Sequence, residues 1–217
     1  MVDVLIKGGP VMIPLLLCSV LALAVAFERI LYMLRTSQDP ERALRLISVA
    51  IDRDRMAEAV AAVQQLRGQI GALATAALTN SNRPRAELEA EVKAVGEREA
   101  FLLESHLPVL DMIVTVAPLL GLLGTVLGLI KNFQILAQTP QVLEAGALSA
   151  GIAEALITTA AGLIIAVPAF ILHVYITGLI DKRLVEMSEF GSSLVNLLSE
   201  RVSEGELSQK QPQKASS

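Results

Sequence analysis

One carboxyl group stands alone in a long apolar stretch of this sequence. Between residues 145 and 180, Glu154 is the only formally charged side chain. Placing a charged group at the centre of a bilayer costs about 2.5–3.5 kcal/mol on insertion scales. Because loss of solvation favours the neutral form of a carboxyl group, a glutamate in such a place can exchange protons. The pattern predicts a proton-relay site, and the alternative is that Glu154 lies near the outer headgroups or pairs with Lys131.

Other polar side chains give weaker indications of chemistry. Thr125 and Thr159 could line a polar path with Glu154, although a threonine in a membrane helix commonly bonds its own backbone one turn back. We expect His173 to be a hydrogen-bonded interfacial residue rather than a proton relay. The lone Cys18 excludes an intrachain disulfide, and no spacing indicates a metal site or a nucleophile with its base. We therefore expect neither an enzyme nor a cofactor.

The composition is that of a membrane protein. Of the 217 residues, 53% are hydrophobic and only 18% are charged, and the mean hydropathy is +0.57. An ordinary water-soluble domain of this length does not have these values. The net charge of −4 provides no basic field of the kind that attracts nucleic acid, so we expect no nucleic-acid partner.

Three apolar runs are long enough to cross a bilayer, which takes about 20 residues of helix. They cover residues 8–27, 112–130 and 145–180, the last interrupted only by Glu154. The first run also resembles a secretory signal, but the segment before it has no net charge, and cleavage would send an arginine-rich segment outward. We therefore expect three membrane-spanning helices.

The basic residues predict the orientation. Residues 32–107 carry ten arginines and lysines, whereas the link 137–149 carries none. Because cytoplasmic segments are the basic ones, the large segment and the C-terminal tail should lie inside and the N-terminus outside. The expected segments are an outer N-terminus at 1–10, a span at 11–31, a cytoplasmic helical domain at 32–107, a span at 108–136, an outer loop at 137–149, a span at 150–180, and a cytoplasmic tail at 181–217 whose end is disordered.

Helices are also expected in the cytoplasmic segment. Asp39 precedes Pro40 as a capping side chain before a first-turn proline, which predicts a helix start. Further helical stretches are predicted at 56–66 and 71–78. From Arg85 a helix rich in Ala, Glu and Leu should run unbroken into the second span. We expect its charges to form a solvated face, and the alternative is a dedicated binding surface. The fold class is therefore all-α, with the second and third spans long and extended by cytoplasmic helices.

Small residues recur every three or four positions in the second and third spans. Such spacing lets helix backbones approach closely, so we expect tight helix packing and association between copies of the chain. The glycines concerned are Gly121, Gly124, Gly128 and Gly162, and in the third span Ala155, Thr158 and Ala166 continue the spacing. Pro118 and Pro168 should each kink a span, with the alternative that a freed carbonyl makes a polar contact at a functional point.

Two long motifs carry a resemblance to a known family. They are APLLGLLGTVLGLI at 117–130 and GIAEALITTAAGL at 151–163, the second followed by AVPA. These motifs resemble the MotA/TolQ/ExbB family of proton channels, among which ExbB and TolQ fit best. By motif match, Glu154 corresponds to the carboxylate that the family carries within the membrane. Thr125 and Thr159 correspond to its pore-lining threonines.

The resemblance implies a proton-driven machine in a bacterial inner membrane. The implied assembly is a ring of five copies, surrounded by lipid, around the single-span helices of a smaller ExbD- or TolR-like partner that supplies an essential aspartate. Inward proton flow would drive a TonB- or TolA-like periplasmic arm, for TonB-dependent uptake or envelope maintenance. The alternatives are a MotA-like motility stator and a non-conducting scaffold. Residues 172–175, Leu-His-Val-Tyr, depart from the tyrosine–asparagine pair of many members, which leaves the subgroup open.

Overall fold

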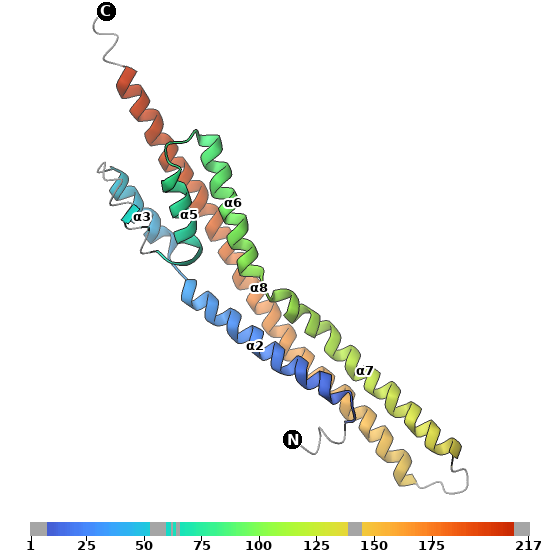
Figure 1. Cartoon of the computed structure of the whole chain (residues 1–217). Helices are drawn as coiled ribbons and strands as arrows, with labels where there is room; N and C mark the ends of the chain where they lie inside the picture. Colours follow the sequence, from blue (N-terminus) through green and yellow to red (C-terminus); the bar gives the residue numbers. More distant parts are fainter. Residues whose placement is uncertain (1–7, 53–59, 62, 64–65, 139–144, 211–217) are drawn as a thin grey trace, which may run out of the picture. The chain divides into compact units, whose positions relative to one another are not determined.

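The computed structural model describes residues 8–52, 60–61, 63, 66–138 and 145–210. The regular secondary structure of this part of the chain is entirely helical. Figure 1 labels them in chain order. They are α2 (Met12–Thr36), α3 (Pro40–Asp52), α5 (Gly68–Thr79), α6 (Arg85–Glu104), α7 (Leu107–Gln138) and α8 (Ala145–Lys210). The prediction of an all-α fold is confirmed.

Three helical stretches are long and apolar enough to cross a membrane. They lie within Met12–Ile51, Arg85–Gln134 and Gly151–Arg201. Large apolar side chains remain exposed along them, and in water such surfaces would associate or aggregate. Examples are Leu23, Phe27, Leu119, Leu122, Ile164 and Ile171. The three-span prediction is confirmed, and the exposed apolar faces are those that lipid or further helices would cover.

The chain divides into two compact units. The first is drawn from Met1–Leu31 and His106–Thr177, and the second from Tyr32–Ser105 and Gly178–Ser217. Helices α2 and α8 each supply residues to both units. In the first unit, the buried side chains include Leu15 of α2, Leu110 and Ile113 of α7, and Ala155 and Ile176 of α8. The candidate residues of the proton path, Glu154, Thr125 and Thr159, all lie within the residue ranges of the first unit.

The helix expected to run unbroken from residue 85 into the second span is interrupted. Helix α6 ends at Glu104 and α7 begins at Leu107. Between them His106 has a φ of +70°, in the left-handed region. The physical reason is Pro108, because proline has no backbone N–H to donate to the carbonyl of Glu104, and in a continuous helix its ring would clash with that carbonyl. The prediction of one continuous helix was wrong.

The other helices of the second unit agree with the sequence patterns in part. Helix α5 includes the predicted stretch 71–78, while most of the stretch 56–66 lies outside the described residues. The predicted tail 181–217 continues α8 as a helix to Lys210, and the rest of it is not described. Buried side chains of this unit include Ile47, Leu73, Leu88, Leu194 and Leu198.

Asp39 caps α3, as its place before Pro40 predicts. Its Oδ1 accepts hydrogen bonds from the backbone N–H groups of Glu41, at 3.0 Å, and Arg42, at 3.3 Å. We expect Asp39→Ala to lower the free energy of unfolding by about 1 kcal/mol, because two helix N–H groups lose their acceptor. Chemical unfolding in mild detergent, followed by circular dichroism, measures this. Asp39→Asn retains an acceptor and should be nearly neutral, and an equal loss in both variants would contradict the cap.

Candidate functional site

Glu154 lies on α8 in an ion pair with Lys131 of α7. Its Oε2 is 3.1 Å from the Lys131 Nζ, and the side chains of Glu154 and Lys131 are 22% and 61% exposed. The other carboxylate oxygen, Oε1, packs against Gly9 so closely that a Cβ at that position would require the carboxylate to shift. Gly9 also has a φ of +71°, in the left-handed region, where a residue with a side chain would be strained. The sequence analysis gave pairing with Lys131 as the alternative to a proton-relay role for Glu154. In this single chain the ion pair is present.

Thr158, one turn after Glu154, ties the chain before α2 to α8. Its side chain is 1% exposed, and its Oγ1 lies 2.8 Å from the carbonyl oxygens of both Gly8 and Glu154. The hydroxyl group has a single proton, so it donates to one of these acceptors at a time. Sequence reasoning counted Thr158 only among the small packing residues. Its spacing of four from Glu154 was the signal that it belongs to the same site.

The two candidate pore threonines bond backbone carbonyls. The Thr125 Oγ1 donates to Leu122 O of its own helix at 2.6 Å, whereas the Thr159 Oγ1 donates across to Gly121 O of α7 at 3.0 Å. In the part of the chain that the structure describes, neither hydroxyl bonds the Glu154 carboxylate. Thr125 thus adopts the bond that isolated membrane helices favour, and Thr159 joins α7 to α8. Their role in a proton path stays a prediction.

The four glycines singled out in the sequence lie where α7 and α8 approach each other, side by side in Figure 1. They are Gly121, Gly124 and Gly128 of α7 and Gly162 of α8. A Cβ on Gly162 would lie 2.6 Å from Ala117 O, and one on Gly128 would lie 3.0 Å from the Ala155 Cβ. These small residues are therefore used within one chain, so by themselves they are no argument for association between copies.

The two prolines lie inside long helices that continue past them, Pro118 in α7 and Pro168 in α8. His173 of α8 has its Nε2 3.9 Å from Asp111 Oδ1 of α7. That separation is at the limit of an ion pair, and Asp111 is exposed. The His173 Nδ1 is buried and has no hydrogen-bond partner among the described residues. Its place at the membrane interface and any part in proton transfer stay predictions.

A second polar cluster, which sequence reasoning missed, joins the end of the apolar part of α2 to the start of α7. Arg29 is 4% exposed, and its Nε and Nη2 donate to the two carboxylate oxygens of Glu28 at 2.8 and 3.1 Å. The His106 Nδ1 lies 2.9 Å from Arg29 Nη2 and 3.2 Å from Glu28 Oε2. The signal in the sequence was a charged pair directly after an apolar run. The cluster holds the left-handed residue between α6 and α7.

His106 gives a clean test of this backbone geometry. We expect the free energy of unfolding of His106→Gly to exceed that of His106→Ala by about 1 kcal/mol. Alanine is strained at this φ and glycine is not, and the larger chain entropy that glycine loses on folding offsets part of the difference. Both variants lose the bonds to Glu28 and Arg29 equally, so their difference isolates the backbone. Thermal unfolding of the pair in one detergent measures it. An alanine variant as stable as the glycine variant would contradict a left-handed residue at this position.

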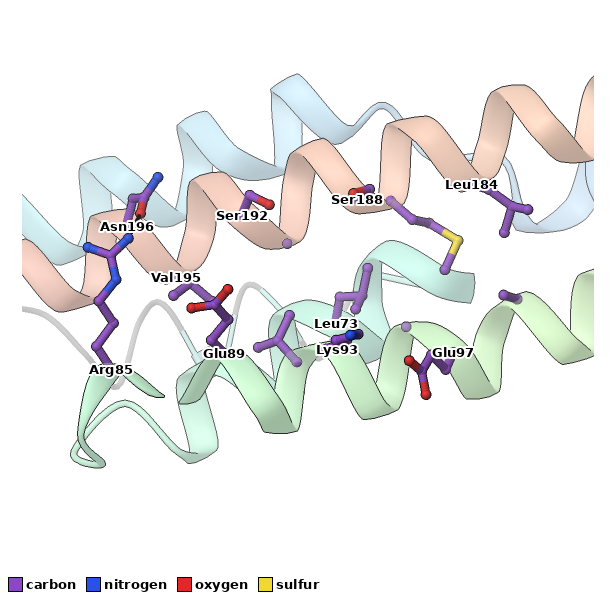
Figure 2. A pocket seen from close by; sticks show the side chains of 15 residues that line it. Leu73, Arg85, Glu89, Lys93, Glu97, Leu184, Ser188, Ser192, Val195 and Asn196 are labelled. Atoms are coloured by element: carbon purple, nitrogen blue, oxygen red, sulfur yellow. Dashed lines mark hydrogen bonds between the residues drawn. The ribbon is translucent and has the colours of Figure 1, made fainter. Parts of the chain in front are cut away.

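The second unit contains a hollow of about 520 Å³ lined by α5, α6 and α8. Figure 2 shows Glu89, Lys93 and Glu97 along α6, with Ser188 and Ser192 on α8. Arg85 Nη2 donates to Asn196 Oδ1 at 2.6 Å across one end. Four of the charged residues of α6 line one wall of the hollow, at intervals of four positions and with alternating sign: Arg85, Glu89, Lys93 and Glu97. All four are exposed, in agreement with the solvated face expected from the sequence.

Comparison with known proteins identifies the family. The model of the MotA/TolQ/ExbB proton channel family matches residues 61–189. An ExbB-like biopolymer transport protein of Synechocystis is 33% identical over 196 residues, which is 89% of this chain and 77% of the relative. The ExbB of Salmonella typhimurium is 29% identical over 185 residues, covering 79% and 72% of the two chains. The Tol-Pal protein TolQ of Pseudomonas aeruginosa is 41% identical over 93 residues, covering 42% and 40%.

The three apolar helices and these matches define a multi-pass membrane protein of the channel and motor class, not an enzyme. The chain belongs to the MotA/TolQ/ExbB proton channel family, and within it the chain is ExbB/TolQ-like. The resemblance found in the two sequence motifs is therefore confirmed. Both motifs lie inside the matched region.

Proposed function

We propose that this chain is the channel-forming motor subunit of a bacterial inner-membrane complex that uses inward proton flow to drive a periplasm-spanning partner. Membership of a proton-channel family and relatives named ExbB and TolQ support this function. The single observation that carries it is Glu154, a carboxylate in a long apolar helix that is held by α7 and by the chain before α2. The basic segment 32–107 supports an N-terminus in the periplasm and a C-terminus in the cytoplasm.

The exposed faces of the long helices support an assembly with more helices than one chain contains. Large apolar side chains of α2, α7 and α8 point outward in the first unit, including Leu23, Leu119 and Ile164. Such faces are covered by lipid or by other helices, as in a ring of five copies around the span of an ExbD- or TolR-like partner. A TonB- or TolA-like arm would then receive the mechanical output.

The driving force is sufficient for mechanical work. One elementary charge that crosses 100 mV releases about 2.3 kcal/mol, and several protons can be summed in one cycle. In this scheme Glu154 takes a proton from the outer side and releases it inward. Thr125 and Thr159 lie in the same first unit and are the further residues that we assign to the path.

The process served by the motor distinguishes the subgroups. Relatives of both the biopolymer-transport and the Tol-Pal kinds match this chain, so TonB-dependent uptake and envelope maintenance are the two candidate tasks. A motility stator would use the same physics. The sequence of the small partner separates these, because a peptidoglycan-binding domain in it favours the stator.

The experiment is proton uptake into liposomes that contain the chain co-purified with its small partner, under an imposed membrane potential. The proposed function predicts uptake that depends on Glu154. A complex that conducts no protons in wild-type form, or conducts equally without the Glu154 carboxyl group, would leave the non-conducting scaffold as the better description.

A further inference from the structure

The ion pair on Glu154 places a cation at the carboxyl group that this chain is proposed to contribute to the proton path. Lys131 follows the apolar run of α7, and its ammonium lies 3.1 Å from Glu154 Oε2. An ammonium at this distance stabilises the carboxylate form by direct electrostatic attraction and by a charge-assisted hydrogen bond. Proton uptake by Glu154 removes that attraction. The pair and the protonated carboxyl group are therefore alternatives.

The two partners of the pair differ in freedom. Glu154 is 22% exposed and is held against the rest of the first unit, whereas Lys131 is 61% exposed. Lysine carries its charge on a flexible four-carbon stem, so the ammonium can leave without a change in the backbone. Lys131 is thus the member of the pair that can move.

The turn before α2 holds the carboxylate in place for this contact. The Gly8 carbonyl accepts a hydrogen bond from Thr158, and the Gly9 backbone packs against Glu154 Oε1. Gly9 has a left-handed φ, so a side chain there would be strained as well as overlapping the carboxylate. Among the described residues, the groups that contact Glu154 from this turn are uncharged, and α7 contributes the cation.

We propose that Lys131 is a positioning residue that holds Glu154 ionised, and that its departure from the carboxylate permits proton uptake. This inference rests on the proposed function of Glu154 as a proton carrier. The Lys131–Glu154 pair then works as a latch: while it is closed the site carries no proton, and while it is open the site can load. A motor subunit needs such a control, because a permanently open carboxyl group would leak protons without work.

The test measures the protonation of Glu154 directly. Carbodiimides add to the protonated form of a carboxyl group in an apolar site, and mass spectrometry quantifies the adduct on Glu154 in the co-purified complex. We expect Lys131→Met to raise the labelling rate of Glu154 about threefold, a modest change because the Lys131 side chain is mostly exposed. Lys131→Arg retains the charge and should label as slowly as the wild-type complex. Lys131→Gln serves as a second neutral variant should the methionine variant fail to assemble.

The outcomes separate this inference from the proposed function. Equal labelling in the wild-type complex and the neutral variants, including no labelling in any of them, would overturn the latch even if Glu154→Gln abolishes proton flux. Normal flux in Glu154→Gln would instead overturn the proposed function, whatever the labelling shows. Faster labelling in both neutral variants and not in Lys131→Arg supports the latch.

Discussion

Glu154→Gln is expected to abolish proton flux through the reconstituted complex while leaving the complex intact. Glutamine has almost the same volume as glutamate and can still accept a hydrogen bond from Lys131. Its amide group, however, cannot take up and release a proton near neutral pH. The loss of the ion pair should cost less than about 1 kcal/mol, because Lys131 is mostly exposed. Proton uptake into liposomes under an imposed potential measures the flux. Size-exclusion chromatography reports whether the complex still forms.

Glu91→Gln is the matched control for this variant. Glu91 lies exposed on α6 in the second unit, so the same chemical change there removes a carboxylate without touching the first unit. We expect its flux to equal that of the wild-type complex. Wild-type flux in Glu154→Gln would assign Glu154 a structural role and favour a scaffold, while lost flux in both variants would point to a general effect of charge on the assembly.

The features that could be predicted from the sequence are those set by local chemistry. A span needs only an apolar run of sufficient length, and a helix start needs only a capping side chain such as Asp39 before a proline. The error in the helix from residue 85 came from giving helix propensity more weight than Pro108. A proline in the first turn is typical of a helix start, and that signal was present in the sequence.

The contacts of the site could not be predicted, because they depend on the register between distant helices. Glu154 stands out by its charge alone, but its contact with Lys131 requires α7 and α8 to align across 23 positions of sequence. The bond between Arg29 and His106 spans 77 positions. Small-residue spacing likewise predicts a close helix contact without stating whether the partner is the same chain or another copy.

The close contact between α7 and α8 depends most on Gly162. A Cβ there would lie 2.6 Å from Ala117 O and 3.1 Å from the Cα of Gly121. Both neighbours are backbone atoms, which cannot move aside as a flexible side chain can. Substitution of Gly162 must therefore push the two helices apart. The shift would also disturb Thr159, whose hydroxyl donates to Gly121 O across the same contact.

We expect Gly162→Ala to lower the free energy of unfolding by about 1–3 kcal/mol, the usual cost of an extra methyl group in a packed interface. Gly178→Ala on the same helix is the control, because a Cβ there has nothing within 4 Å. Both variants gain up to about 1 kcal/mol of helix propensity, so their difference isolates the clash. Thermal unfolding in mild detergent, followed by circular dichroism, measures both. Equal stability in the two variants would mean that α7 and α8 do not approach each other at Gly162, and the arrangement of Glu154 and Lys131, which depends on the same helix pair, would then need to be revised.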